Sequence, residues 1–117
     1  MDIESNPSKG CGWSSSKNAN CAYVAALVMA AAARNVSVGI YSSNYEWTLV
    51  AGTACTKSPL PGVPLWYAGY ATPPQPSCKD FKPFGWWSAP FAHQFADHAV
   101  VVPPSCKLPP ADSSVVC

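Results

Sequence analysis

The longest apolar stretch of the chain predicts an α-helix over residues 22–35. Its sequence, AYVAALVMAAAARN, is rich in alanine, the residue with the highest helix propensity. Apolar side chains lie almost all round this helix, so we expect it to be mostly buried. The apolar part is roughly a dozen residues long, whereas a bilayer span needs about 20. We therefore expect a core helix and not a membrane anchor.

Three shorter apolar segments predict strands. Residues 36–41 are β-branched and apolar with little polar alternation, which is typical of a parallel strand covered on both faces. Residues 65–68 and 91–95 predict two further short strands. Because helices and strands alternate along the chain, the pattern favours an α/β fold.

Polar and turn-forming residues separate these elements. Residues 5–20 are rich in Ser, Asn and Gly and predict a loop, and residues 100–117 show no clear period. A short second helix is expected from Ser43 or Asn44 to about Val50, because Ser and Asn are favoured helix caps.

Cysteine content points to an oxidising compartment, because cytosolic reductants keep thiols reduced. Six cysteines in 117 residues predict a secreted or lysosomal protein, and 15 pairings are possible for them. No Cys-x-x-Cys pair or histidine cluster supports a zinc site. The six are Cys11, Cys21, Cys55, Cys78, Cys106 and Cys117.

Net charge argues against two classes of partner. Seven basic and six acidic side chains give a formal charge of +1, which creates no field to attract nucleic acid or an anionic membrane. Charged residues make up 11% of the chain, against about 25% in ordinary soluble domains. Fourteen aromatic residues, five Trp, five Tyr and four Phe, suit either a sugar-stacking cleft or a packed core.

Two carboxylates near the amino end are candidates for acid chemistry. Residues two apart on a strand point to the same side, so Asp2 and Glu4 would project together. Glycosidases use paired carboxylates to protonate the leaving oxygen and to stabilise positive charge on the sugar ring. A solvated strand end is the alternative for this pair taken by itself.

A series of motifs in fixed order gives the pair a context. The motifs are Asp2-Ile3-Glu4, VGIYSS at 38–43, YEW at 45–47, PLWYAGY at 64–70, FGWWS at 84–88 and HQFAD at 93–97. Taken together this series resembles glycoside hydrolase family 25, the Chalaropsis-type lysozymes, and particularly the cysteine-containing forms of amoebae and nematodes. The resemblance covers about residues 1–97.

The resemblance implies hydrolysis of the β-1,4 bond between N-acetylmuramic acid and N-acetylglucosamine in bacterial peptidoglycan. It implies Glu4 as the general acid, and Asp2 as the group that supports the substrate's acetamido group or stabilises developing charge. No metal or cofactor is implied. The expected partner is cell-wall peptidoglycan, bound by a monomer, with no nucleic acid and no membrane.

Further site residues are expected at the ends of strands, where barrel enzymes build their sites. Tyr41 and Tyr67 are expected to face the sugar, and Trp66 is a further candidate, although neighbours on a strand face opposite ways. The resemblance places Gln94 near the cleft. His93 and His98 are expected to be surface loop histidines, and Trp86, Trp87 and Phe91 to serve mainly in packing.

The implied fold is an α/β protein formed by the carboxyl-terminal portion of a modified β/α barrel. A complete barrel typically needs about 200 residues or more, so 117 residues predict an incomplete, TIM-like one with an open sheet. We expect a partial family domain at residues 1–97 and a divergent tail with prolines and cysteines at 98–117. The family's last strand carries a further Asp, and Asp112 is not expected to replace it. We therefore expect the chain to be a fragment or a truncated isoform.

Disulfide pairing is expected partly from the same resemblance. Cys11 with Cys21 would close the loop before the first helix, and Cys55 would reach a cysteine after the family's seventh strand, for which Cys106 is the nearest candidate. Cys78 and Cys117 are then left as a remainder.

Two alternatives to an enzyme stay open at this point. One is a module that binds peptidoglycan or chitin-like glycans without cleaving them, since the aromatic residues would serve that function too. The other is a small secreted protein held by disulfides with no glycan role.

Overall fold

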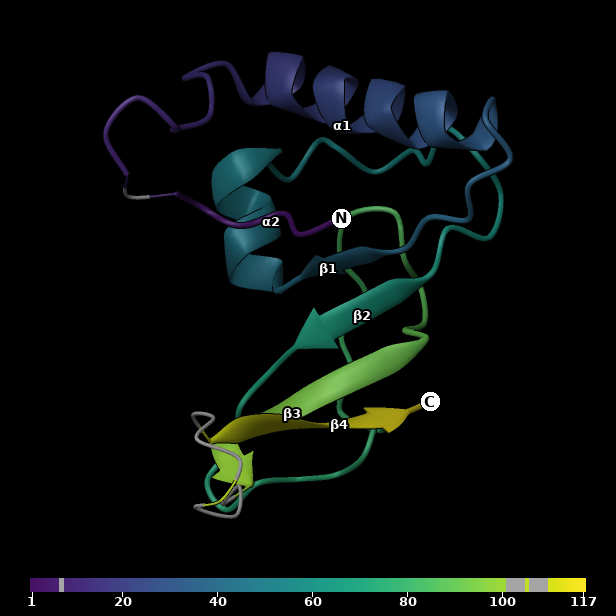
Figure 1. Cartoon of the computed structure of the whole chain (residues 1–117). Helices are drawn as coiled ribbons and strands as arrows, with labels where there is room; N and C mark the ends of the chain where they lie inside the picture. Colours follow the sequence, from purple (N-terminus) through teal and green to yellow (C-terminus); the bar gives the residue numbers. More distant parts are fainter. Residues whose placement is uncertain (7, 101–104, 106–109) are drawn as a thin grey trace.

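The computed structural model describes residues 1–6, 8–100, 105 and 110–117. Their four strands form one sheet in the order β1-β2-β3-β4 (Figure 1). β1 and β2 are parallel, as are β2 and β3, whereas β4 runs antiparallel to β3. The mixed α/β class predicted from the pattern is confirmed. The elements are α1 (Lys17–Ala32), β1 (Ile40–Ser42), α2 (Asn44–Val50), β2 (Leu65–Ala68), β3 (Ala92–Val100) and β4 (Ala111–Val116).

Helix α1 begins earlier and lies closer to the surface than its composition predicted. Ser16 caps it, because its hydroxyl oxygen accepts a hydrogen bond from Ala19 N at 3.3 Å. Val24 and Val28 are buried on one side, but Tyr23 is 58% exposed on the other. The expectation of a mostly buried helix is therefore wrong. The helix lies at the outside of the molecule, above α2 and β1 in Figure 1, so only one stripe can reach the core.

Helix α2 follows the prediction closely. Its cap is Ser43, whose hydroxyl accepts from Glu46 N at 3.0 Å. Trp47 and Val50 point into the core with 1% and 2% of their surface exposed. Gly52 follows the helix with a φ of +80°, a conformation that other residues rarely adopt.

The sheet has one covered and one open face. Register places Ile40 beside Leu65 on the covered face and Tyr41 beside Trp66 on the open face. Ile40 and Leu65 are almost completely buried, whereas Trp66 is 43% exposed. A strand covered on both faces was expected at residues 36–41, and this is wrong, because no element packs over Tyr41 within the described residues.

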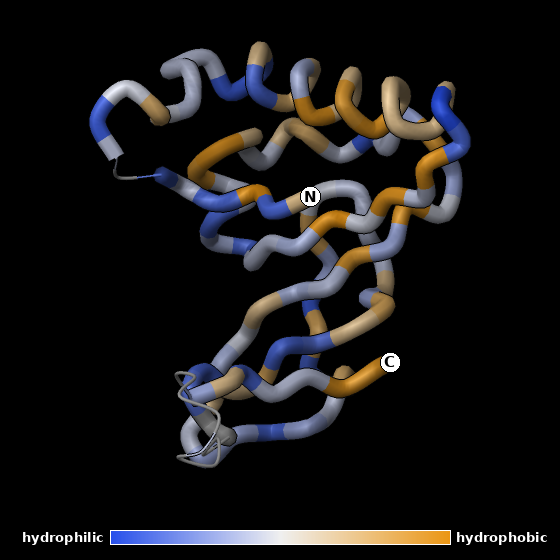
Figure 2. The backbone as a smooth tube through the Cα atoms, in the orientation of Figure 1, coloured by the Kyte–Doolittle hydropathy of each residue, from blue (hydrophilic) through white to orange (hydrophobic). Residues whose placement is uncertain are grey.

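The hydrophobic core lies between the helices and the covered face of the sheet. Figure 2 shows apolar stretches where α1, α2 and β1 approach one another, and mostly hydrophilic colours in the connections at the bottom of the view. The twelve residues of the core cluster are Ile3, Val24, Val28, Ile40, Trp47, Val50, Ala51, Cys55, Val63, Leu65, Tyr67 and Trp87.

The carboxyl-terminal residues form a strand that the sequence pattern did not predict. β4 pairs with β3 through registers such as Ala92 with Val116 and Gln94 with Ser114. β3 itself runs past the predicted residues 91–95 to Val100. Residues 111–116 carry only a short β-branched run, so the strand depends on its partner rather than on its own pattern.

Two disulfides join the described residues, and their pairing corrects the expected one. Cys21 bonds to Cys55, and Cys78 bonds to Cys117. The expected Cys11–Cys21 and Cys55–Cys106 bonds are wrong, because Cys21 lies inside α1 and its side chain faces the segment after α2. Cys11 is exposed and forms no disulfide, and Cys106 lies outside the described residues. Cys78 with Cys117 is the pair that was left as a remainder.

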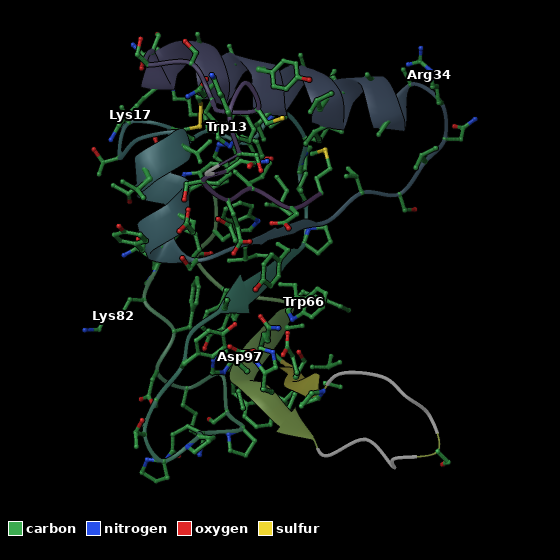
Figure 3. The ribbon with its side chains drawn as sticks, turned by 60° about the vertical axis from the view of Figure 1, so that its left-hand side comes forward. Trp13, Lys17, Arg34, Trp66, Lys82 and Asp97 are labelled. Atoms are coloured by element: carbon green, nitrogen blue, oxygen red, sulfur yellow. A yellow bond between two sulfur atoms is a disulfide. The ribbon has the colours of Figure 1, made fainter. Side chains whose placement is uncertain are left out.

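Figure 3 places Lys17 and Arg34 near opposite ends of α1 and Lys82 on a separate connection. In the described part of the chain, neither helix has the length and apolar character needed to cross a bilayer.

Candidate active site

The amino-terminal segment runs beside β1 and turns two carboxylates toward the open face of the sheet. Ile3 N donates to Tyr41 O at 2.9 Å, and Tyr41 N donates to Met1 O at 2.8 Å, which is a parallel pairing. Ile3 is 2% exposed and packs in the core. Since side chains alternate along an extended chain, Asp2 and Glu4 point the other way, as expected.

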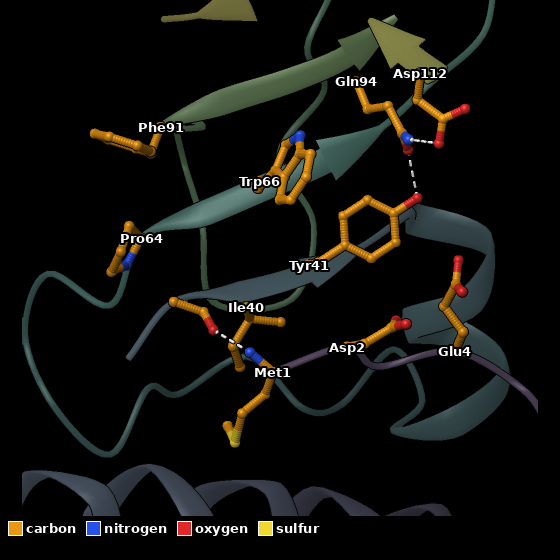
Figure 4. A pocket seen from close by; sticks show the side chains of 11 residues that line it. Met1, Asp2, Glu4, Ile40, Tyr41, Pro64, Trp66, Phe91, Gln94 and Asp112 are labelled. Carbon is orange, nitrogen blue, oxygen red and sulfur yellow. Dashed lines mark hydrogen bonds between the residues drawn. The ribbon is translucent and has the colours of Figure 1, made fainter. Parts of the chain in front are cut away.

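Both carboxylates line a cleft of about 660 Å³ on the open face (Figure 4). Three elements supply the rest of its polar wall: Tyr41 from β1, Gln94 from β3 and Asp112 from β4. The cleft is lined by Met1, Asp2, Glu4, Gly39, Ile40, Tyr41, Pro64, Trp66, Phe91, Gln94 and Asp112.

Gln94 is the hydrogen-bonding centre of this wall. Its Oε1 accepts from Tyr41 OH at 2.5 Å and from Tyr70 OH at 2.9 Å, and its Nε2 donates to Asp112 Oδ2 at 2.5 Å. The side chain is 5% exposed, so its orientation is fixed by these partners rather than by solvent. Gln94 thereby sets the positions of two phenol groups and one carboxylate.

Asp112 corrects the expectation for the tail. The sequence context argued against Asp112 as a replacement for the Asp of the family's last strand, yet β4 places it on the wall of the cleft. Its Oδ1 accepts from His98 N at 3.0 Å in addition to the bond from Gln94. The short segment ADSSVV next to Cys117 was the only available signal, and only the pairing with β3 gives it a direction.

The pKa values of two carboxyl groups in the cleft, those of Glu4 and Asp112, are shifted in opposite directions. Burial raises the pKa of Glu4, and the negative charges of Asp2 and Glu46 raise it further. The hydrogen bond from the His98 backbone lowers the pKa of Asp112, with further help from neighbouring side chains. Glu4 therefore holds its proton more tightly than an ordinary Glu, and Asp112 releases its proton more readily than an ordinary Asp.

Tyr41 remains a neutral hydrogen-bond donor in this setting. Burial raises its pKa, the neighbouring Tyr70 hydroxyl adds to the shift, and so do the negative charges of Glu4 and Asp2. A phenol in the cleft can therefore donate to the sugar or to Gln94, but it cannot serve as a base near neutral pH.

Exposed aromatic side chains extend the cleft away from the carboxylates. Trp66 is 43% exposed and meets the Tyr41 ring edge-on, with 5.1 Å between the centroids. Phe91 is 58% exposed and also lines the cleft, so the expectation that it serves mainly in packing is wrong. A pyranose ring can pack its C–H face on surfaces of this kind.

Comparison with known proteins gives the chain a family. A family model described as "Lysozyme-like protein 1" matches residues 2–95. The "Probable GH family 25 lysozyme 3" of Dictyostelium discoideum is 37% identical over 95 residues, which is 81% of this chain and 18% of that protein. The chain belongs to the lysozyme-like proteins of glycoside hydrolase family 25.

Other relatives of this lysozyme-like chain come from an amoeba and a nematode, as the resemblance predicted. "Counting factor 50" of Dictyostelium discoideum is 40% identical over 86 residues, covering 74% of the chain and 27% of the relative. "Lysozyme-like protein 7" of Caenorhabditis elegans is 33% identical over 94 residues, which cover 76% of the chain and 32% of that relative. The chain thus spans about a third or less of these three relatives. No solved structure gives a significant match.

Tyr67 of the lysozyme-like chain does not lie in the cleft. It is 9% exposed on the covered face, stacked on His93 with 4.1 Å between the ring centroids. Trp66, its neighbour, occupies the cleft instead. The expectation that Tyr67 faces the sugar is therefore wrong, because strand alternation allows only one of the two to do so.

The two histidines differ from each other. His93 is 5% exposed, and its Nδ1 and Nε2 each lie 2.7 Å from a carbonyl oxygen, of Ser77 and Gly69 respectively. The expectation of a surface loop histidine is wrong for His93, which joins two parts of a connection to β3. His98 is exposed, as expected, and its ring contacts Asp97.

The only group of three or more possible metal ligands in the described residues consists of Asp97, His98 and Asp112, whose ligand atoms lie within 4.8 Å of one another. All three are exposed, and both oxygens of Asp112 already accept hydrogen bonds.

Proposed function

We propose that this chain contributes a muramidase active site that cleaves the β-1,4 bond between N-acetylmuramic acid and N-acetylglucosamine in peptidoglycan. The observation that carries the proposal is that Asp2 and Glu4 line one cleft and that the pKa of Glu4 is raised. A protonated carboxyl group is what a glycosidase needs to donate a proton to the leaving oxygen. Membership of the lysozyme-like family supports the same reaction.

In this proposal each polar side chain of the cleft has a role. Glu4 is the general acid, and Asp2 supports the substrate's acetamido group or stabilises charge on the ring. Asp112, with its lowered pKa, stays ionised beside the oxocarbenium-like transition state. Gln94 holds Asp112 and Tyr41 in place, and Trp66 packs against a sugar ring.

The fold is proposed to be the carboxyl-terminal portion of a modified β/α barrel. Three parallel strands, with helices on one face and the cleft residues on the other, support this. The open face would then be the inside of the barrel. Residues 1–97 would form the family domain, with 98–117 as a divergent tail that still adds β4 to the sheet. Two disulfides are consistent with a secreted or lysosomal protein, proposed to act as a monomer.

The test compares the unmodified 117-residue chain with Glu4→Gln on purified bacterial peptidoglycan. Released muropeptides are identified by mass spectrometry, and wall binding is measured by co-sedimentation. We expect Glu4→Gln to abolish release while binding is unchanged, because the amide keeps the shape of the side chain but cannot donate the proton. Asp80→Asn is the matched control, since Asp80 lies outside the cleft, and its release should equal that of the unmodified chain.

A second candidate function is wall binding without cleavage, favoured by the exposed aromatic rings of Trp66 and Phe91. Binding without any release by the unmodified chain would support this candidate and overturn the hydrolase proposal. Release that persists in Glu4→Gln would overturn the role of Glu4.

A further inference from the structure

Tyr70 lies beside the wall of the cleft, and 57% of its surface is exposed. It follows β2 by two residues, and its hydroxyl group donates to Gln94 Oε1 at 2.9 Å. Gln94 is buried and lines the cleft. Because the only polar group of the Tyr70 side chain is directed inward to a buried amide, the exposed part of this side chain is mainly its aromatic ring.

The backbone next to Tyr70 is fixed by two contacts. Gly69 N donates to Gln94 O at 3.1 Å, and Gly69 O lies 2.7 Å from His93 Nε2. Together with the bond from its own hydroxyl group, these contacts hold the Tyr70 ring at both ends. A rigid, exposed aromatic ring loses little conformational entropy when a ligand packs against it. Tyr70 therefore has the properties of a preformed binding surface.

Tyr70 and Glu4 lie at the same edge of the sheet. The amino-terminal segment and β2 flank β1, and both run parallel to it. Their register places Glu4 level with Ala68, two residues before Tyr70. Two strand spacings, about 10 Å, separate the amino-terminal segment from β2. A polymer that lies across these strand ends from Glu4 would therefore reach Tyr70.

The exposed ring of Phe91 extends the cleft in another direction. Figure 4 shows Phe91 and Pro64 at the end of the cleft away from Glu4 and Gln94. Tyr70 belongs to the Glu4 end, because its hydroxyl group contacts Gln94. The bond that a glycosidase cleaves lies between two sugar units, and the general acid stands beside that bond. A binding surface is therefore needed at the Glu4 end as well.

We propose that the Tyr70 ring packs against a sugar unit next to the cleaved bond of a β-1,4-linked glycan. A pyranose unit in such a polymer presents C–H bonds on its face, and this apolar face can lie on an aromatic ring. Gln94 holds the ring in place from behind. The choice of glycan and of the cleaved bond rests on the proposed function.

The experiment measures binding by isothermal titration calorimetry with a peptide-free tetrasaccharide of alternating N-acetylglucosamine and N-acetylmuramic acid. The parent protein is the 117-residue chain with Glu4→Gln, so that binding is measured without the proposed proton donor. We expect Tyr70→Ala in this parent to weaken binding roughly 3- to 10-fold, the range for loss of one aromatic contact. Tyr70→Phe keeps the ring, and its binding should stay within about twofold of the parent.

Tyr23→Ala is the matched control for loss of an exposed aromatic ring. Tyr23 is 58% exposed, but it lies on α1, which packs on the covered face of the sheet. Its replacement should leave glycan binding unchanged. Thermal unfolding followed by circular dichroism shows whether each variant is folded. Tyr70→Leu, which has an apolar side chain without a flat ring, takes the place of Tyr70→Ala if the alanine variant does not fold.

Three results would overturn the proposal. Equal binding by Tyr70→Ala and the parent would mean that no sugar contacts the ring. Equal weakening in Tyr70→Ala and Tyr70→Phe would mean that Tyr70 acts only through its hydrogen bond to Gln94. Absence of binding by the parent would also overturn it, whereas the hydrolase proposal is decided separately, by release of muropeptides by the unmodified chain.

Discussion

Gln94 Nε2 donates a hydrogen bond to Asp112 Oδ2 across the antiparallel pair β3–β4, with 2.5 Å between the two atoms. This bond connects β4 to the wall of the cleft, which residues of the amino-terminal segment such as Asp2 also line. It also leaves the Gln94 oxygen free to accept from Tyr41 and Tyr70. One buried amide therefore connects four parts of the sequence.

Replacing that amide tests its role in positioning. Gln94→Met keeps the length of the side chain but removes both tyrosine acceptor contacts and the bond to Asp112. We expect muropeptide release to fall roughly 10- to 100-fold, because misplaced charge-stabilising groups cost about that much in rate. Gln75→Met, in an exposed connection, is the matched control. Unchanged release in Gln94→Met would show that the amide has no part in catalysis.

The raised pKa of Glu4 predicts a pH effect at a distance from Glu4 itself. Glu46→Gln removes a negative charge that raises the Glu4 pKa, while the amide oxygen can still accept from Ser5 N. The Glu4 pKa should then fall, so the alkaline limb of the release rate should move to lower pH. Initial rates across acidic and neutral pH measure this. A limb that stays in place or moves to higher pH would contradict the assignment of Glu4 as the general acid.

The raised pKa of Glu4 also predicts how the free energy of unfolding depends on pH. A carboxyl group whose pKa is raised in the folded state holds its proton more tightly there than in the unfolded chain. The contribution of the Glu4 carboxyl group to the free energy of unfolding is therefore present at low pH and is lost as pH rises through the folded-state pKa of Glu4. Glu46→Gln should reduce this loss. Urea unfolding on either side of the transition measures it, and a larger loss in the variant would contradict the argument.

The Cys21–Cys55 disulfide should be a main source of stability. It closes a loop with a sequence separation of 34 residues, and loop-closure entropy for that length is worth about 4 kcal/mol. The double variant Cys21→Ser with Cys55→Ser should lose roughly this much free energy of unfolding. Cys11→Ser is the control and should change little, because Cys11 is exposed and forms no disulfide. Non-reduced peptide mapping that shows Cys11 joined to Cys21 would contradict the pairing.

His93 should matter for folding rather than for the reaction. Its ring lies between the carbonyl oxygens of Gly69 and Ser77 and stacks on Tyr67. His93→Phe keeps an aromatic ring for stacking but loses the polar contacts, and should reduce the free energy of unfolding by about 1–3 kcal/mol. His98→Phe, at an exposed position, should change it by less than about 0.5 kcal/mol. Equal effects of the two changes would contradict the inference.

Local patterns in the sequence determined the parts of the fold that depend on neighbouring residues. The segment LWYA forms β2 at the predicted positions, and Ser43 caps α2 as predicted. Alternation likewise placed Asp2 and Glu4 on one side of an extended segment, because that depends only on backbone geometry. The motifs also identified the family, because their order and spacing along the chain can be read from the sequence alone.

Tertiary structure decided what depends on partners distant in the chain. Asp112 enters the cleft only because β4 pairs with β3, and Tyr67 leaves it because its face of β2 packs on His93. Cysteine pairing also follows from which segments meet in space. Pairing across a sheet is a long-range interaction. Its energy depends on two segments that are distant in the sequence, and the local pattern of one segment does not reveal which other segment it will pair with. That is the physical reason why the carboxylate pair could be predicted from the sequence, whereas the positions of Asp112, Phe91 and Tyr67 relative to the cleft could not.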